Sequence, residues 1–120
     1  MEAFLATVAS FLAAAVRVAT PLTFAGIGEA FSERAGIVNI GVEAIMLAGA
    51  YAAFMATFTT GSILLGALAG IAGGVCVSMI HALLSIRCRA NLNIAGLALN
   101  TLTLGLTSFL FMKGFGQSTV

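Results

Sequence analysis

Long apolar runs separated by short polar turns are the feature that most restricts how this chain can fold. Three of the runs are long enough to cross a bilayer: Gly41–Thr59, Ile63–Ile86 and Leu92–Met112. At 1.5 Å per residue, a helix over the first of these is about 28 Å long, close to the hydrocarbon thickness of a membrane. Only 8% of residues are charged, 61% are hydrophobic and the mean hydropathy is +1.15. The chain is therefore predicted to be an integral membrane protein.

The spanning elements are predicted to be helices, because the runs lack the short alternation of a membrane barrel and helices satisfy their own backbone groups in lipid. The expected fold class is all-α, polytopic, with about four membrane helices. Residues 1–120 are expected to form a single transmembrane domain.

The first 31 residues allow two interpretations of the N-terminal span. Ala3–Val16 and Pro21–Phe31 are apolar, and Arg17 lies between them. One possibility is a long tilted helix that is kinked near Pro21. The other is a short segment at or dipping into the membrane, followed by a helix that begins near Pro21, where proline is well tolerated. An arginine at mid-bilayer costs about 2.5–3.5 kcal/mol, which favours a break between residues 17 and 20.

The polar turns carry most of the basic residues, and these indicate an orientation. Arg34, Arg87 and Arg89 fall on one side of the predicted spans, and only Lys113 falls on the other. By the positive-inside rule, the turns that contain Glu33, Arg34, Arg87 and Arg89 are predicted to be cytoplasmic.

Small residues follow one face of two neighbouring spans. Gly66, Gly70 and Gly74 repeat every four residues, so they share a helix face that another backbone can approach closely. A similar face on the preceding span consists of Ala44, Ala48, Ala52 and Ala56. We expect these two spans to pack as an antiparallel pair within one bundle, which is favoured over a dimerisation face.

Polar residues in the spans are the candidates for function. Asn39 and Glu43 are four residues apart and would be neighbours on a helix that begins near Asn39. For Glu43, a role in holding the turn at the membrane boundary is favoured over solute or proton binding. The last span carries a polar and small stripe of Asn93, Gly96, Asn100, Thr103 and Thr107. This stripe fits hydrogen bonding between helices and a path for a polar solute equally well.

Several classes of function are excluded by the sequence. A net charge of +1 gives no basic surface for nucleic acid. No metal-ligand spacing exists, because His81 is the only histidine and has no ligand partner nearby in sequence. Cys76 and Cys88 would lie about 18 Å apart along a helix, too far for a disulfide. No nucleophile, base and acid set and no phosphate-binding glycine loop is present, so an enzyme is not expected.

Four strings in the sequence resemble a known family in their order and type. They are Ala19-Thr20-Pro21-Leu22, the stretch from Ser32 to Glu43 (SERAGIVNIGVE), His81-Ala82-Leu83-Leu84-Ser85 and Gly96-Leu97-Ala98-Leu99-Asn100. The chain resembles the permease subunits of bacterial ABC importers of the ribose, nucleoside and branched-chain amino acid group, most closely the nucleoside and simple-sugar branch. By length, it looks like the N-terminal part of such a permease.

The resemblance implies a multi-pass subunit of the bacterial cytoplasmic (inner) membrane that moves a nucleoside or simple sugar. Its implied partners are a second permease subunit, cytoplasmic ATPase subunits, an extracytoplasmic solute-binding protein and the lipid bilayer. No cofactor is expected in this chain, since ATP and magnesium would bind to the ATPase subunits. Asn39, Glu43 and Asn100, with Thr103 and Thr107 of the stripe, are then candidate pathway or gating positions. The alternative is a self-contained small membrane protein of about four helices, such as a dimeric proton-coupled exporter that uses Glu43, or a structural bundle.

Overall fold

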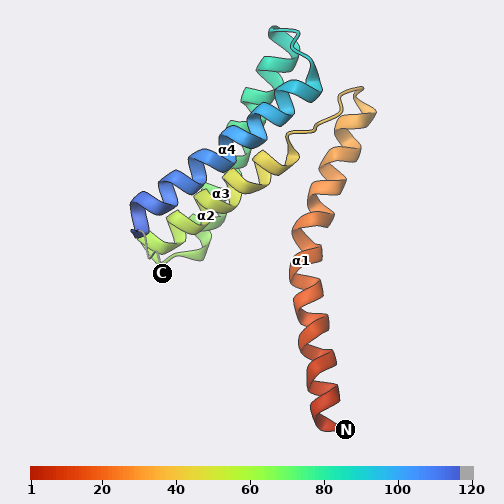
Figure 1. Ribbon diagram of the computed structural model, residues 1–120, viewed down its shortest axis with the longest axis vertical. Coiled ribbons are helices and arrows are strands. Elements are labelled where there is room, and N and C mark those ends of the chain that lie inside the picture. The colour runs from red at the N-terminus through yellow and green to blue at the C-terminus, as the bar shows by residue number, and fades with distance from the viewer. Residues whose placement is uncertain (117–120) are drawn as a thin grey trace. The chain divides into compact units, whose positions relative to one another are not determined.

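The computed structural model describes residues 1–116, which form helices and short connections (Figure 1). The helices are α1 (Glu2–Arg34), α2 (Val42–Thr60), α3 (Ile63–Ala82) and α4 (Leu92–Phe115), and α3 continues into a π-helical turn, η1 (Leu83–Arg87). Within residues 1–116, four helical segments are long and apolar enough to cross a membrane, the third being α3 together with η1. The predicted all-α membrane fold is thus confirmed. Residues 1–37 and residues 38–116 form two compact units, which are described in turn.

The first unit contains α1, which is one continuous helix of 33 residues with Pro21 inside it. The expected break between residues 17 and 20 is therefore wrong. Proline has no N–H, so it deprives the carbonyl of Arg17 of its usual partner but leaves the rest of the helix intact. Close by, the Thr20 hydroxyl donates to the Val16 carbonyl at 2.7 Å. Breaking the helix would expose many backbone groups in lipid, which costs more than the single hydrogen bond that proline removes.

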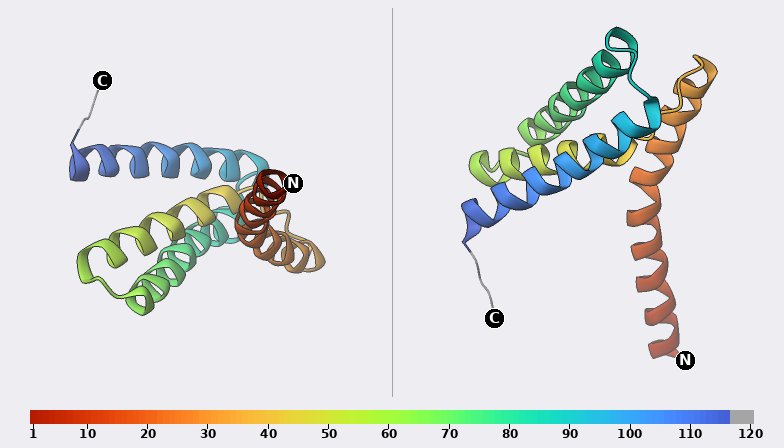
Figure 2. Two further views of the ribbon diagram at one scale, coloured as in Figure 1. Left: turned by 90° about the horizontal axis from the view of Figure 1, so that it is seen from below. Right: turned by 45° about the horizontal axis from the view of Figure 1, so that its top comes forward.

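The second unit begins with an antiparallel pair, α2 and α3 (Figure 2). Only Gly61 and Ser62 connect the two helices. Gly61 has a φ of +69°, a left-handed conformation that glycine adopts without steric cost, and its N–H donates to the Thr57 carbonyl at 2.8 Å. This bond ends α2, and the tight turn lets α3 run back antiparallel to it.

The backbones of α2 and α3 approach closely where glycines meet. A Cβ atom on Gly70 would lie 3.0 Å from the Cβ of Ala53 and 3.2 Å from the carbonyl oxygen of Gly49. In return, a Cβ on Gly49 would lie 3.1 Å from the carbonyl oxygen of Gly70. Neither position therefore has room for a side chain, and contact between the helices is made largely by backbone atoms.

Other glycines of α3 also face α2, with some differences from the sequence expectation. A Cβ on Gly66 would meet Thr57 and Ala53, and one on Gly74 would meet Ile45. Gly73, which is not part of the predicted four-residue repeat, faces Ala48 and Ala52 as well. Of the four alanines expected on this face of α2, Ala48 and Ala52 contact α3 in this way, and the backbone N–H of Ala44 is bonded to Asn100 of α4.

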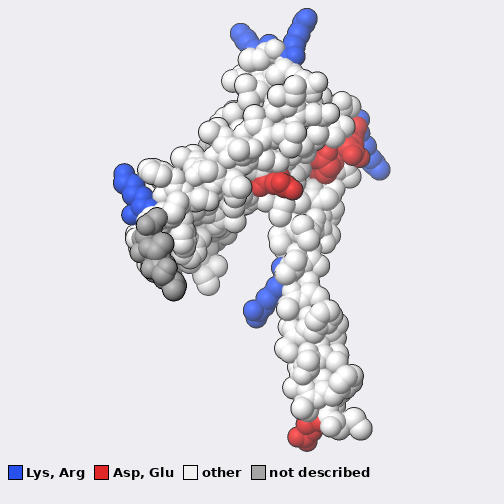
Figure 3. Space-filling model, viewed as in Figure 1, with Lys and Arg blue, Asp and Glu red and all other residues white. Residues whose placement is uncertain are grey.

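α4 runs in the same direction as α2 and lies against it (Figure 2). Near its beginning, Asn100 bonds to Ala44, and near its end the ring of Phe111 lies 6.1 Å from that of Phe54. Arg87 and Arg89 precede α4 and Lys113 lies in its last turn, so basic groups mark the two ends of this unit, with one acidic group on the largely uncharged surface between them (Figure 3).

Replacing Gly70 by valine is expected to lower the free energy of unfolding in detergent by about 1–3 kcal/mol, because the new side chain would force α2 and α3 apart. The matched control is Gly105→Val on α4, where a Cβ would meet nothing within 4 Å. Its effect should stay within about 0.5 kcal/mol. Unfolding by sodium dodecyl sulfate, followed by circular dichroism, measures both. Equal losses in the two variants would contradict the close approach of α2 and α3 at Gly70.

Candidate functional site

Polar side chains gather where α2 begins. The helix starts at Val42, and the residue before it, Gly41, has no side chain to cap the first N–H groups. Asn39 lies in the connection before the helix, and its Oδ1 accepts a hydrogen bond from the Gly41 N–H at 3.2 Å. The expectation that Asn39 and Glu43 are neighbours on one helix is therefore wrong, because only Glu43 is part of α2.

Asn100 of α4 supplies the cap that α2 lacks. Its Oδ1 accepts a hydrogen bond from the Ala44 N–H at 2.9 Å, and its Nδ2 donates to the Ile40 carbonyl at 3.1 Å. The same Nδ2 lies 3.4 Å from Oε2 of Glu43. One amide therefore satisfies a donor in the first turn of α2 and an acceptor just before it.

Gly96 allows Asn100 to come this close. It lies one turn earlier in α4 and is buried, and a Cβ at this position would be 2.9 Å from the Cβ of Ile40 and 3.0 Å from the backbone nitrogen of Gly41. Any larger residue would hold the two segments apart. Gly96 and Asn100 thus act together to seat the beginning of α2 against α4.

The rest of the polar stripe on α4 does not join this cluster. Thr103 and Thr107 are buried, and the Thr107 hydroxyl donates to the Thr103 carbonyl within the same helix at 2.7 Å. Asn93 is exposed near the start of α4. Of the candidate pathway positions, the structure therefore brings Asn39, Glu43 and Asn100 together around the beginning of α2. Thr103 and Thr107 lie farther along α4.

A groove opens between α2 and α4 beside this cluster. It has a volume of about 320 Å³ and is lined by Glu43, Ala44, Leu47, Leu97, Asn100, Thr101 and Leu104. Thr101 was not among the residues predicted from the sequence, and its hydroxyl donates to the Leu97 carbonyl at 3.0 Å. The carboxylate of Glu43 can accept hydrogen bonds from a polar molecule there, whereas the amide of Asn100 is already bonded to Ala44 and Ile40.

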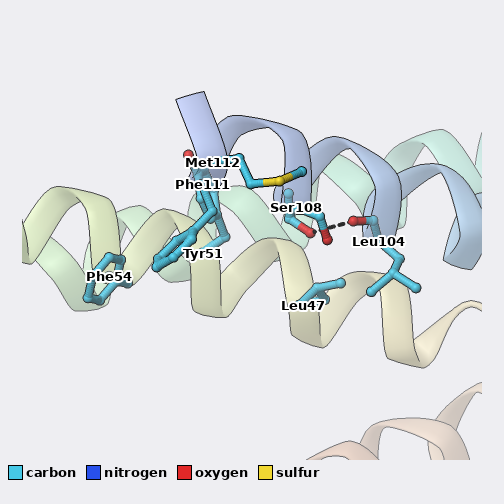
Figure 4. A pocket seen from close by; sticks show the side chains of 8 residues that line it. Leu47, Tyr51, Phe54, Leu104, Ser108, Phe111 and Met112 are labelled. Atoms are coloured by element: carbon cyan, nitrogen blue, oxygen red, sulfur yellow. Dashed lines mark hydrogen bonds between the residues drawn. The ribbon is translucent and has the colours of Figure 1, made fainter. Parts of the chain in front are cut away.

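A second, apolar groove of about 500 Å³ adjoins the first and shares Leu47 and Leu104 with it (Figure 4). Its lining also contains aromatic side chains, Tyr51 and Phe54 from α2 and Phe111 from α4. The two grooves form one trough, polar near Glu43 and aromatic at the other end. Aromatic residues at helical spacing are common in bundles, so the sequence alone gave no sign of this trough.

His81 packs against the beginning of α2 from the side of α3. It is 4% exposed, and a Cβ on Gly41 would lie 3.1 Å from its Nδ1. His81 therefore leaves no room for a side chain at position 41. In the same way, Ile40 leaves no room for a side chain at position 96 of α4. The sequence indicated a packing or interfacial role for His81 but could not show the segment that it contacts.

The charged turns follow α1 and α3. Glu33 and Arg34 are exposed at the end of α1, and Arg87 and Arg89 are exposed after α3. The cytoplasmic location of these turns stays a prediction.

Replacing Asn100 by alanine is expected to lower the free energy of unfolding by about 1–3 kcal/mol, because the Ala44 N–H and the Ile40 carbonyl lose their partner. The control is Asn93→Ala, the same change at an exposed position of the same helix, with an expected effect within about 0.5 kcal/mol. Hydrogen exchange should also rise in residues 42–45 of Asn100→Ala and not of Asn93→Ala. Unchanged exchange in Asn100→Ala would show that Asn100 does not cap α2.

Comparison with known proteins places the chain in a family. Residues 11–120 match the family model described as branched-chain amino acid transport system / permease component. A putative glucose ABC transporter permease protein of Haloferax volcanii is 45% identical over 93% of this chain, which corresponds to 34% of that protein. A guanosine ABC transporter permease protein of Bacillus subtilis is 38% identical over 83% of the chain and 33% of its own length.

A nucleoside ABC transporter permease protein of Lactococcus lactis is 37% identical over 84% of the chain and 34% of its own length. The chain thus spans about a third of the length of the curated relatives that it matches. No solved structure matches it significantly. The matches to sugar and nucleoside permeases argue against the alternative of a self-contained exporter. Together with four helices suited to spanning a membrane, they show that the chain belongs to the permease-component family of branched-chain amino acid transport systems.

Proposed function

We propose that the chain is part of the membrane-spanning subunit of an ABC importer that moves a nucleoside or a simple sugar. The observation that carries this proposal is the shared class of its relatives, which are named as permeases for glucose, guanosine and nucleosides. All of these solutes carry several hydroxyl groups. A carrier of such solutes needs acceptors and donors inside the membrane that are not fully used by the protein itself.

The trough between α2 and α4 is where we place contact with the solute. Glu43 is exposed in the first turn of α2 and directs a carboxylate to the groove, where it can accept hydrogen bonds from hydroxyl groups. The N-terminal end of α2 favours a negative charge at this position. The adjoining aromatic groove offers ring surfaces to the less polar face of a sugar or base.

Transport is driven by other chains in this proposal. ATP and magnesium bind to cytoplasmic ATPase subunits, a second permease subunit completes the membrane pathway, and an extracytoplasmic solute-binding protein delivers the solute. This chain then performs no chemical step and needs no cofactor of its own. Its place is the cytoplasmic membrane, the inner membrane in a bacterium with two membranes. Asn39 and Asn100 hold the beginning of α2 in position for Glu43.

Deleting the gene is expected to abolish ATP-dependent uptake of one radiolabelled solute among guanosine, uridine, glucose and ribose. The intact protein should also copurify with an ATPase of the ABC type. Re-expression of the gene is the control and should restore uptake of the same solute. Retained uptake of all four solutes would refute the proposed function.

Changing Glu43 to glutamine is expected to lower kcat/KM for uptake about tenfold, because a neutral amide accepts weaker hydrogen bonds than a carboxylate. Most of the loss should be in KM, since Glu43 is proposed to bind the solute and drives no step. The matched control, Glu2→Gln, makes the same chemical change in the first turn of α1 and should leave uptake unchanged. If both variants transport like the wild type, the solute does not bind at Glu43.

A further inference from the structure

Hydroxyl groups in these helices follow a common pattern. Ten Ser and Thr side chains donate to the carbonyl four residues earlier, at distances between 2.6 and 3.2 Å. Thr57, for example, donates to Ala53 at 2.8 Å. In an apolar environment this bond satisfies the hydroxyl group without any other partner, because the carbonyl four residues earlier is within its reach in an α-helix.

Ser78, Thr103, Ser108 and Ser85 make no such bond, and Ser85 differs from the other three because its hydroxyl oxygen is buried without a partner among residues 1–116. Ser85 lies in η1, where the Cys88 N–H donates to the Leu83 carbonyl five residues earlier, at 3.3 Å. In this wider turn the Ser85 hydroxyl makes no bond to the carbonyl of His81, four residues before it. Leaving a buried polar group unpaired is unfavourable, so the π-helical register has a cost.

Two further observations show that this end of α3 is under constraint. Both ring nitrogens of the buried His81 lack a hydrogen-bond partner within the described part of the chain. Both nitrogens of an imidazole can form hydrogen bonds, so both are unsatisfied here. Shortly after η1, Arg89 has a φ of +49°, a left-handed conformation that is uncommon for a residue with a side chain. Short π-helical turns of this kind are often found at functional sites.

We propose that residues 83–87 exchange between the observed π-helical register and an α-helical register in which the Ser85 hydroxyl donates to the His81 carbonyl. The α-helical register satisfies the hydroxyl in the same way as the ten others. It removes one residue from the turn, so Arg87 and Cys88 rotate by about 100° around the axis of α3 and move along it by about 1.5 Å. The short connection from Cys88 to Asn91 takes up the displaced residue.

The exchange links the arginine-bearing turn to the candidate site. α4 begins at Leu92, directly after this connection, and carries Asn100, which holds the beginning of α2. His81 holds the same segment from α3. The turn at η1 therefore lies in sequence between His81 and Asn100, the two residues that contact the beginning of α2, and a partner that binds the turn at Arg87 and Arg89 can select one register.

The chain's own cysteines provide the test. Cys76 lies in α3 before η1, Cys88 lies directly after it, and both are free and exposed. Spin labels on these two cysteines of the intact permease in lipid nanodiscs, measured by pulsed electron paramagnetic resonance, should give two distances. Ser85→Ala should reduce the population of the α-helical register about fivefold, because it removes the bond formed only there. Ser85→Thr keeps the hydroxyl and should keep both distances.

Ser78→Ala is the matched control, since it makes the same chemical change at an exposed position of α3 before the turn. It should give the wild-type distribution. A single distance in the wild-type protein overturns the proposal. So does a distribution that Ser85→Ala leaves unchanged, or one that Ser78→Ala alters as much as Ser85→Ala does.

Discussion

The side-chain amide of Asn100 is the interaction on which the second unit of this protein depends. It joins α4 to the beginning of α2, across 56 residues of sequence, through one accepted and one donated backbone hydrogen bond. Ala44 is buried, so leaving its backbone N–H without this partner would be unfavourable. Glu43, the single carboxylate of this unit, is held at the start of α2 by the same arrangement.

Small residues make this arrangement possible from two sides. Gly96 lets α4 reach Ile40, and Gly41 leaves room for the imidazole of His81 on α3. Apolar side chains give little attraction between helices in lipid, so close backbone contact and hydrogen bonds decide how the helices pack. The trough along α2 and α4 forms because these helices are held at the Asn100 end and again through aromatic rings at Phe54 and Phe111.

The membrane helices could be predicted from the sequence because their length and apolarity are set by the bilayer. Features that depend on distant residues could not. Asn100 bonds to a residue 56 positions away, so its partner cannot be read from local sequence spacing. The continuity of α1 through Pro21 reflects the high cost of breaking a helix in lipid. The position of Asn39 before α2 follows from its bond to Gly41, which competes with helix formation. The π-helical turn at Leu83–Arg87 leaves no periodic signal in so short a segment.

The two-residue connection between α2 and α3 also bears on how the protein assembles. Contacts between these helices join residues close in sequence, which favours their formation before contacts over longer separations. We therefore expect the α2–α3 hairpin to enter the membrane and pack as a unit. The Ala44 N–H in the first turn of α2 has no side-chain partner until α4, which carries Asn100, packs against α2. During synthesis, the first turn of α2 thus lacks its side-chain cap until the ribosome has delivered α4.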